Sequence, residues 1–537
     1  MYKATCMYIS YQPGANGIVY AALVSSVRKD GKVTRGDDTV YLGRVLDKER
    51  LIFRNRTDGI FALDPKSFAK KAAPADFVPN TPRKNAKQSE RSLDFGDVFF
   101  LKSFMDQNGV EMLIDAVGYG NNDSLWSLLC YYMLTRSTNC HCNTWWQGNI
   151  ACGYYAKANL ISQRISDLLE TIGREATIQN FFKAYIPFIR TLSDSVRKQK
   201  GSKDPNEIDP NDQLEQSDCI LIDSTGLPNC IRFPLTAVSN HNGKISNEVR
   251  LIYVVQQGTG LPIYMRYVPG NVIDASTLIT TMRELKAQKV DTKFAILDAG
   301  YVTETNLKEL VESKVSFLSR LPDNRILFKK LVNESGEELV NDDNLVRYGE
   351  RLVYLKRFEC EIIPGHKGYA YLGLDLAERS MLQKQIARTA NADNLSIAEV
   401  KKQMKNKGIF CLVCSRPIAV NNILPLYYTR QDIEQVFDIS KNYASMLPLC
   451  VQSEETFRGH LLMTFLATVI QRLIQLKAHS HKWSLDDLFT ILRNHKCKAF
   501  TDVIIPQEAT KKQNEIYKAF GIKIPKTISA SISSCVD

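Results

Sequence analysis

The sequence contains no apolar run long enough to cross a membrane. Its longest apolar stretch, Leu461 to Ile470, is interrupted by two threonines and bounded by His460 and Gln471. A transmembrane helix needs roughly 20 consecutive apolar residues. The first residues, Met-Tyr-Lys-Ala-Thr-Cys, also lack the apolar core of a signal peptide. We therefore expect a cytoplasmic protein with no membrane partner.

The cysteines do not have the spacing of a disulfide framework or of a zinc site. There are 13, an odd number, scattered from Cys6 to Cys535, which is typical of reduced thiols. Cys411 and Cys414 have the spacing of half a zinc site. However, they lie in a predicted strand, where positions i and i+3 face opposite sides, and no second pair follows. We expect core thiols there.

The chain also lacks the composition of disordered, fibrous or low-complexity proteins. Of its 537 residues, 44% are hydrophobic and 24% are charged, and the 28 glycines follow no period. This length predicts about three folded domains. The 69 Lys and Arg against 58 Asp and Glu leave a net charge of +11, a modest excess that favours a polyanionic partner.

Three patterns divide the first part of the chain. In residues 1–64, short apolar runs alternate with turn signals, which predicts a small β-rich unit. Residues 65–95 are basic and contain prolines; they are expected to lie along a phosphate backbone or to be a solvated connector. In residues 96–205 apolar residues recur at intervals of three and four, which predicts a helical region.

After a polar stretch at 198–217, short strands alternate with helices. We expect strands followed by βα units, hence a mixed sheet flanked by helices, from 206–321 and 408–480. Residues 322–407, partly strand-like and partly helical, are predicted to be an insertion domain. Residues 481–537 are predicted to be a basic helical tail.

Two aspartates follow buried-looking strands. Asp223 comes after Cys-Ile-Leu-Ile, and Asp298 comes after Phe-Ala-Ile-Leu. Active sites of α/β sheets assemble at the carboxyl ends of strands, so both carboxylates would face one crevice if the two strands are neighbours. The alternative is that each aspartate is an ordinary turn or cap residue.

A polar stripe follows the predicted strand at 409–414. At about 100° per residue, steps of three, four and seven residues place its four members within an arc of about 60° on a helix: Tyr427, Arg430, Glu434 and Lys441. Another face, with Ile433, Val436 and Phe437, can pack on a sheet. The stripe is then free to face a ligand, unless it belongs to a solvated helix with an ordinary Arg430 to Glu434 ion pair.

This Y-x2-R-x3-E-x6-K spacing resembles the signature of bacterial insertion-sequence transposases, which have a DDE catalytic triad in an RNase H-like domain. Asp298-Ala-Gly300-Tyr301 is similar to the family's segment around the second aspartate. Asp223-Ser-Thr225 resembles the segment around the first, and Gly270-Asn271-x-x-Asp274 resembles the loop between them. The resemblance is clearest from about residue 218 to 478.

The resemblance implies a multidomain α/β protein and a DNA transposase. Its catalytic residues, which are also the metal ligands, would be Asp223, Asp298 and Glu434, holding two Mg²⁺ ions with Mn²⁺ as a substitute. Tyr427, Arg430 and Lys441 would bind DNA, and the helical region 96–205 would bind DNA or form the dimer. The implied partners are double-stranded transposon ends and target DNA, bound by a homodimer in a synaptic complex. A metal-dependent endonuclease without strand transfer and a non-catalytic DNA-binding descendant remain as alternatives.

The sequence departs from the best-understood members of this group in one respect. Those members use tryptophans to hold a flipped base during hairpin formation, but no tryptophan lies between Trp146 and Trp483 here. The aromatic residues expected to stack instead are Tyr301, Tyr427, Tyr354 or Tyr369.

Overall fold

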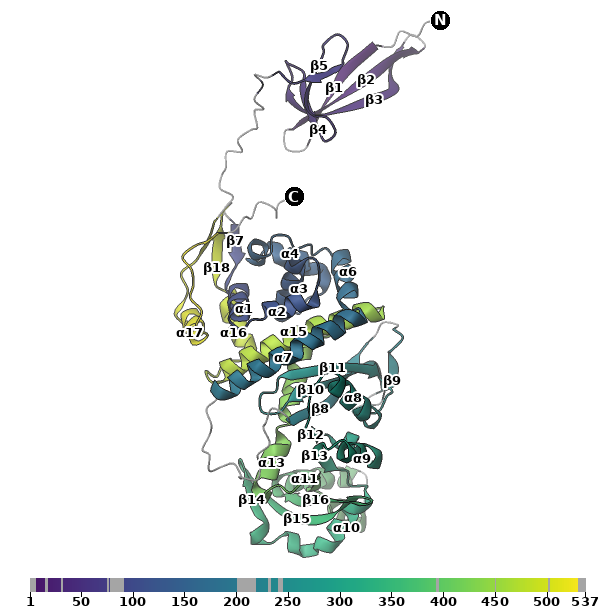
Figure 1. The fold of residues 1–537 in the computed structure, drawn as a ribbon, viewed down its shortest axis with the longest axis vertical. Coiled ribbons are helices and arrows are strands. Elements are labelled where there is room, and N and C mark those ends of the chain that lie inside the picture. Colours follow the sequence, from purple (N-terminus) through teal and green to yellow (C-terminus); the bar gives the residue numbers. More distant parts are fainter. Residues whose placement is uncertain are drawn as a thin grey trace. The chain divides into compact units, whose positions relative to one another are not determined.

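The computed structural model describes residues 6–14, 18–29, 32–74, 77, 91–199, 219–229, 233–239, 245–392, 396–449, 451–500 and 503–529. The chain is a multidomain α/β protein that forms two compact units, Met1–Ser89 and Glu90–Asp537 (Figure 1). The polar stretch expected to separate the helical region from the strands lies mostly outside the described residues.

The first unit is a single antiparallel sheet. Its strands are consecutive in space as in sequence: β1 (Cys6–Pro13), β2 (Val19–Lys29), β3 (Lys32–Asp47), β4 (Ile52–Asn55), β5 (Gly59–Leu63) and β6 (Lys70–Ala72). One face buries a small core that includes Leu23, Phe53 and Phe61. The sheet continues to Ala72, beyond the predicted limit at residue 64, because the backbone of β6 pairs with β5. Part of the predicted basic linker is therefore a strand.

The second unit begins with helices, as the apolar periodicity predicts. They are α1 (Gly96–Gln107), α2 (Glu111–Val117), α3 (Asn122–Leu134), α4 (Cys142–Gln147), α5 (Ala151–Tyr154), α6 (Ser162–Ile172) and α7 (Glu175–Gln199). A later helix, α15 (Glu454–His479), packs on α3 and α6 and also reaches β11 (Figure 1). By length and composition α15 is apolar enough to cross a membrane, but 83% of its most apolar stretch is buried inside the protein, as in a core helix.

A large mixed sheet forms the centre of the second unit. The predicted meander is present as β8 (Cys219–Pro228), β10 (Ser246–Gln256) and β11 (Pro262–Pro269), with the short β9 (Ala237–Ser239) beside β10. The predicted βα units follow as α8 (Leu278–Ala287), β12 (Phe294–Leu297), α9 (Glu304–Glu312) and β13 (Ser316–Leu321). Strand β12 lies between β8 and β13 and is parallel to both.

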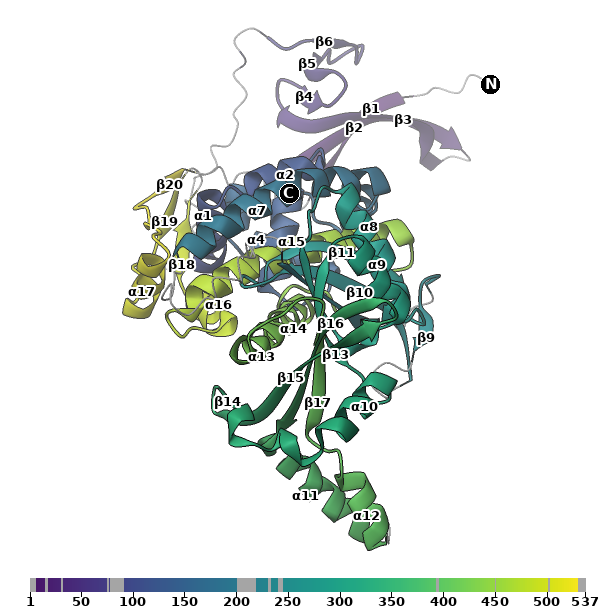
Figure 2. The ribbon, with the colours of Figure 1, turned by 60° about the horizontal axis from the view of Figure 1, so that its bottom comes forward.

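The predicted insertion is not a separate compact unit. Its strands β14 (Leu345–Tyr348), β15 (Arg351–Ile363) and β16 (His366–Asp375) extend the large sheet, because β16 pairs with β17 (Ile409–Cys414), which in turn pairs with β13. Figure 2 shows β15 and β16 in the same sheet as β13 and β17, with β14 at the edge. Helices α10 (Ile326–Ser335), α11 (Leu376–Ala392) and α12 (Ile397–Met404) complete the segment. Both Cys411 and Cys414 are buried in β17 as core thiols.

The C-terminal segment predicted to be helical contains strands as well. After α16 (Leu485–Arg493), strands β18 (Lys496–Ala499), β19 (Val503–Pro506) and β20 (Ile528–Ser529) flank α17 (Lys511–Ala519). Strand β18 pairs with β7 (Arg91–Asp94), so the start and the end of the unit share one small sheet. The lysines of this segment predicted a basic helical tail, but the strands bury apolar residues, among them Cys497, Ala499 and Ile504.

Candidate active site

Asp223 and Asp298 lie at the same edge of two neighbouring parallel strands. The last residue pair between β8 and β12 is Ile222 with Leu297, and each aspartate is the next residue in its chain. This is the neighbour relation that the sequence required. Strand β8 nevertheless continues to Pro228, because Asp223 and the residues after it pair with β10. Asp223 therefore lies within a strand, while Asp298 precedes a short 3-10 turn.

The guanidinium of Arg430 joins the three predicted catalytic carboxylates. Its Nη1 lies 2.6 Å from Asp298 Oδ1, and its Nη2 lies 3.1 Å from Asp223 Oδ2. Glu434 Oε1 is 3.8 Å from the same Nη2. Arg430 also donates to the hydroxyl of Tyr427 over 3.3 Å. Residues that are 207 and 132 positions apart in the chain thus meet around one cation.

The electrostatics of this cluster are unbalanced. Burial raises the pKa of Asp223 to about 6; the charge of Arg430 opposes this rise, and the charge of Asp298 adds to it. Burial alone would lower the pKa of Arg430, but the two aspartates more than offset it, so that pKa is raised. One positive charge faces three carboxylates, and the site therefore retains an excess of negative charge.

The polar stripe does not lie on one continuous helix, in contrast to the prediction. Helix α13 (Val420–Tyr428) ends before Arg430, which is the N-cap residue of α14 (Gln431–Asp438), and Lys441 lies in a π-helical turn, η9 (Ile439–Tyr443). The apolar face packs as predicted: Ile433, Val436 and Phe437 are buried. The ring of Phe437 stacks on that of Tyr253 in β10, with centroids 5.4 Å apart.

Lys441 points to the strand that carries Asp223 rather than to the carboxylates themselves. Its Nζ donates to Thr225 Oγ1 over 2.5 Å. Burial lowers the pKa of this ammonium group, and the carboxylate of Glu248 opposes that effect. The predicted residues therefore form a row along β8, with Arg430 at Asp223 and Lys441 two residues further on.

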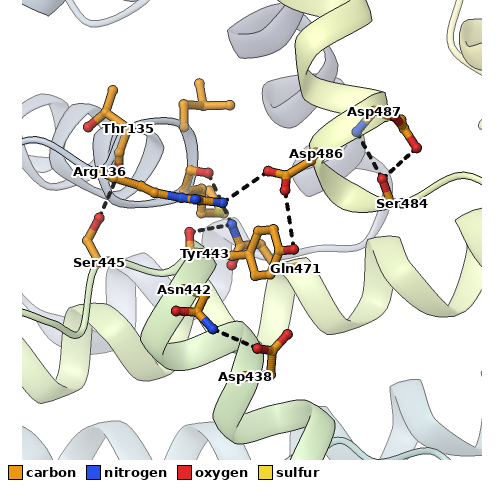
Figure 3. Close-up of polar contacts among 12 residues, drawn as sticks. Thr135, Arg136, Asp438, Asn442, Tyr443, Ser445, Gln471, Ser484, Asp486 and Asp487 are labelled. Carbon is orange, nitrogen blue, oxygen red and sulfur yellow. Dashed lines mark hydrogen bonds and ion pairs between the residues drawn. The ribbon is translucent and has the colours of Figure 1, made fainter.

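The segment after Lys441 is fixed to the helical region by several polar contacts (Figure 3). Ser445 Oγ donates to the carbonyl oxygen of Thr135 over 2.8 Å. Gln471 of α15 donates to the carbonyl oxygen of Tyr443 over 2.8 Å. The Tyr443 hydroxyl and Arg136 share the carboxylate of Asp486, at 3.3 and 3.1 Å. The helical region thus holds the turn that carries Lys441.

A fourth carboxylate, Asp274, belongs to the same neighbourhood. It accepts from Ser224 Oγ over 2.5 Å and from Arg250 Nη1 over 2.9 Å. It also lines a cavity of about 420 Å³ together with Arg250, Asn271 and Gly300. In the sequence, Asp274 stands in the Gly-Asn-x-x-Asp segment but also directly before Ala-Ser-Thr-Leu, which favours a helix cap over a catalytic role. Its contact with the residue after Asp223 is visible only in the fold.

The tyrosines expected to stack on a base differ in exposure. Tyr301 is fully buried, with an exposed fraction of 0%, and cannot receive a base in this arrangement. Tyr427 is also buried, against Arg430. Tyr354 and Tyr369 are half-buried on β15 and β16. Tyr301 ends the short 3-10 turn that follows Asp298, and this turn places its ring in the core.

A divalent cation suits the donor chemistry of the cluster. The described residues contain no group of three His, Cys, Asp or Glu side chains already at metal-binding distances, because the Arg430 guanidinium takes the central position. Carboxylate oxygens are the ligands that Mg²⁺ and Mn²⁺ prefer. Three carboxylates surround the single guanidinium, and the raised pKa of Asp223 means that its negative charge is poorly stabilised there. A further positive charge would stabilise it.

Comparison with known proteins identifies a family model that matches the segment containing the cluster. Residues 215–470 match the model of a family described as the transposase DDE domain, and this segment contains all three carboxylates and Lys441. The match supports a DDE transposase family. No curated protein matches the chain. A solved structure that matches is a piggyBac transposase synaptic complex with hairpin DNA, at 12% identity and a TM-score of 0.29, over 51% of this chain and 51% of that chain.

Proposed function

We propose that this protein is a DNA transposase that binds the terminal inverted repeats of its own insertion sequence and cleaves and joins DNA through Asp223, Asp298 and Glu434. The observation that carries the proposal is the convergence of these three carboxylates on Arg430 within the segment that matches the transposase DDE domain. The mixed sheet, with β8 and β12 parallel at its centre, supports an RNase H-like catalytic domain.

The three carboxylates would hold Mg²⁺, with Mn²⁺ as a substitute. When bound, two such ions supply activation of the attacking oxygen and stabilisation of the leaving oxygen. The protein residues contribute position. Neighbouring parallel strands fix Asp223 and Asp298 beside each other, whereas Glu434, with an exposed fraction of 62% for its side chain, approaches from α14 at the open side.

Arg430, Lys441 and Tyr427 are the proposed DNA contacts of this centre. A guanidinium fork and an ammonium group are suited to two successive phosphates. Arg430 is presently engaged by carboxylates, so phosphate binding would exchange these partners for DNA oxygens. We further propose that the protein acts in a bacterial cytoplasm, on transposon ends and target DNA that are held by a homodimer.

The test of this function is a strand-transfer reaction. Purified protein is incubated with a labelled duplex carrying the element's terminal repeat and with a target plasmid, in Mg²⁺ or in EDTA, and Glu434→Gln is compared with the wild type. Joined products that disappear in EDTA and in the variant are expected. Cleavage without joining would instead identify an endonuclease, and binding without cleavage a non-catalytic DNA-binding protein.

A further inference from the structure

The outer face of the N-terminal sheet carries aromatic and basic side chains together. The register pairs Gln12 with Tyr20, and Tyr20 with Arg44. It also pairs Arg44 with Arg54. Cross-strand partners share a face of a sheet, and so do alternate residues along a strand. The residues that share this face therefore include Tyr8, Tyr20, Tyr41, Arg44 and Arg54.

A bulge in β3 brings Tyr41 and Arg44 to this one face although they are three residues apart. The register shifts between Ala21 and Ala22, so Tyr41 pairs with Ala22 while Leu42 turns into the core. Gly43 has φ +94°, and an added Cβ would lie 2.2 Å from the carbonyl oxygen of Arg54. The bulge thus depends on glycine at this position.

The three tyrosines are open to solvent on a face opposite the core. Their exposed fractions are 46% for Tyr8, 36% for Tyr20 and 60% for Tyr41. The main core of this unit lies on the other face, with Leu23, Phe53 and Phe61. On the tyrosine face, Val24 and Ile52 are also buried, and Val24 is the cross-strand partner of Tyr8. A sheet face with three large exposed rings is unusual for a surface that meets only water.

Charge identifies the partner of this face. Residues 1–89 contain 16 Lys and Arg against 8 Asp and Glu, so this unit contributes +8 of the total net charge of +11. Such a concentration of positive charge in a sixth of the chain favours a polyanion and opposes a second copy of the same surface. Arg44 and Arg54 lie among the rings and supply guanidinium groups for phosphates.

We infer that this face, the Tyr8–Tyr20–Tyr41 platform with Arg44 and Arg54, binds a single-stranded segment of nucleic acid by stacking bases on the tyrosines. In a duplex the base faces are covered by their neighbours, so only unpaired bases can stack on protein rings. Tyr41 pairs with Ala22 and Tyr8 pairs with Val24, two and four residues along β2 from Tyr20. At roughly 3.4 Å per residue, their distances from Tyr20 along the strand direction are ~7 Å and ~14 Å. The platform therefore offers separate places for several unstacked bases. The inference rests on the proposed function only in taking DNA as the source of the strand.

The test uses the full chain and a labelled single-stranded oligonucleotide of roughly 20 nucleotides, with its blunt duplex for comparison. Fluorescence anisotropy is measured for the wild type, Tyr8→Ala/Tyr41→Ala, and Tyr8→Phe/Tyr41→Phe. Stacking predicts that the alanine variant loses about fivefold or more in single-strand affinity per ring removed. The phenylalanine variant, which keeps the rings, stays within about twofold of the wild type. Val33→Ala, at an exposed apolar position of the same unit, is the control and leaves binding unchanged.

Cross-linking locates the site directly. A bromodeoxyuridine oligonucleotide irradiated with the full chain is expected to modify the peptides that carry Tyr8, Tyr20 or Tyr41. Unchanged affinity in the alanine variant, cross-links confined to other segments, or loss of self-association rather than of DNA binding would each overturn the inference. Glu434→Gln separates the two proposals, because it removes cleavage and leaves single-strand binding intact if the platform is independent of the catalytic carboxylates.

Discussion

Arg430 is the residue that connects the carboxylates of the site. Its guanidinium contacts Asp223 and Asp298 directly and lies within ion-pair distance of Glu434. A fork of donors satisfies two carboxylates at once, which a point charge would not do. The same position suits a divalent cation. In the proposed function, the guanidinium and a metal ion would therefore compete for the same carboxylate oxygens.

Replacement of Arg430 is expected to tighten metal binding. Arg430→Met keeps much of the side-chain volume but leaves Asp223 and Asp298 without their counter-charge, so the affinity for Mn²⁺ should rise about fivefold or more, an effect on the order of 1 kcal/mol. Titration calorimetry or the electron paramagnetic resonance signal of free Mn²⁺ measures it. The control is Arg283→Met, at an exposed arginine 3.7 Å from Glu309. Equal or weaker Mn²⁺ binding by Arg430→Met would contradict competition at the site.

Sequence reasoning identified the participants at this scale but not their contacts. The spacing of Tyr427, Arg430, Glu434 and Lys441 predicted one face of a single helix. The structure brings the first three together around the Arg430 guanidinium, whereas Lys441 contacts Thr225 from a π-helical turn. The spacing could not predict that Arg430 bridges two distant aspartates, because that contact depends on the pairing of β8 with β12. Asp274 was ambiguous for the same reason, since its partner Ser224 is 50 residues away.

Helix α15 is the element that links the helical region to the sheet. It crosses α6 closely at Gly459, where an added Cβ would lie 1.9 Å from the carbonyl oxygen of Leu169. Gly173 makes the reciprocal approach to Glu455, so two glycines allow the helices to touch through their backbones. Backbone atoms cannot move aside as a flexible side chain does.

Gly459→Ala is accordingly expected to destabilise the second unit. Overpacking at such a crossing costs about 1–3 kcal/mol, so the temperature of thermal unfolding should fall by several degrees. Gly120→Ala is the matched control, because an added Cβ there meets nothing within 4 Å. Differential scanning calorimetry compares the two variants with the wild type. Equal unfolding temperatures for both variants would mean that α6 and α15 can separate without cost.

His460, also on α15, predicts a dependence of stability on pH. It is buried, its Nδ1 lies 2.9 Å from the Tyr132 hydroxyl, and its Nε2 lies 3.1 Å from the carbonyl oxygen of Met446. Burial lowers its pKa. Below about pH 6.5 the unfolded chain binds a proton that the folded chain does not, so stability falls as pH falls.

The effect is measured against His460→Gln, which does not titrate. Between pH 7 and pH 5, the free energy of unfolding of the wild type should fall relative to the variant, by at most about 1.4 kcal/mol per pH unit. Denaturant unfolding at several pH values gives both curves, and His495, which is present in both proteins, cancels. Parallel curves would show that His460 is not held neutral in the folded protein.

Most strands of the large sheet could be predicted from the sequence. The breaks within the predicted helix and the pairing of strands far apart in the chain could not. Runs such as Phe294-Ala-Ile-Leu are apolar throughout and became buried strands. The stripe from Tyr427 to Lys441 was predicted to be one helix, but α13 ends at Tyr428, and Lys441 lies in the π-helical turn η9. The periodicity of apolar residues does not reveal such a break. It also does not reveal that β18 pairs with β7, about 400 residues earlier in the chain.

At the scale of the whole molecule, most of the net positive charge and the carboxylate cluster belong to different units. Residues 1–89 carry +8, which leaves only +3 for the 448 residues of the second unit. The carboxylate cluster lies entirely in the second unit. If the proposed function holds, electrostatic attraction to DNA and cleavage of DNA would depend on different residue ranges.

Deletion of residues 1–89 should remove many of the contacts to DNA phosphates, so DNA binding should become both weaker and less dependent on salt. The slope of log affinity against log salt concentration is about −0.9 per neutralised phosphate, so the truncated chain should show a shallower slope by several units. Anisotropy with a duplex between about 50 and 200 mM salt measures it. The second unit has its own extensive core and should still unfold cooperatively. An unchanged slope would place the phosphate contacts elsewhere.

The central claim, that the three carboxylates hold the metal that cleaves DNA, is tested most directly by metal rescue of Glu434→Cys. A thiolate binds Mn²⁺ more readily than Mg²⁺. We expect this variant to give no cleavage or strand transfer in Mg²⁺ and to recover products in Mn²⁺. Asp438→Cys, one turn along and bonded to Asn442, should remain active in both metals. Full activity of Glu434→Cys in Mg²⁺ would contradict the account.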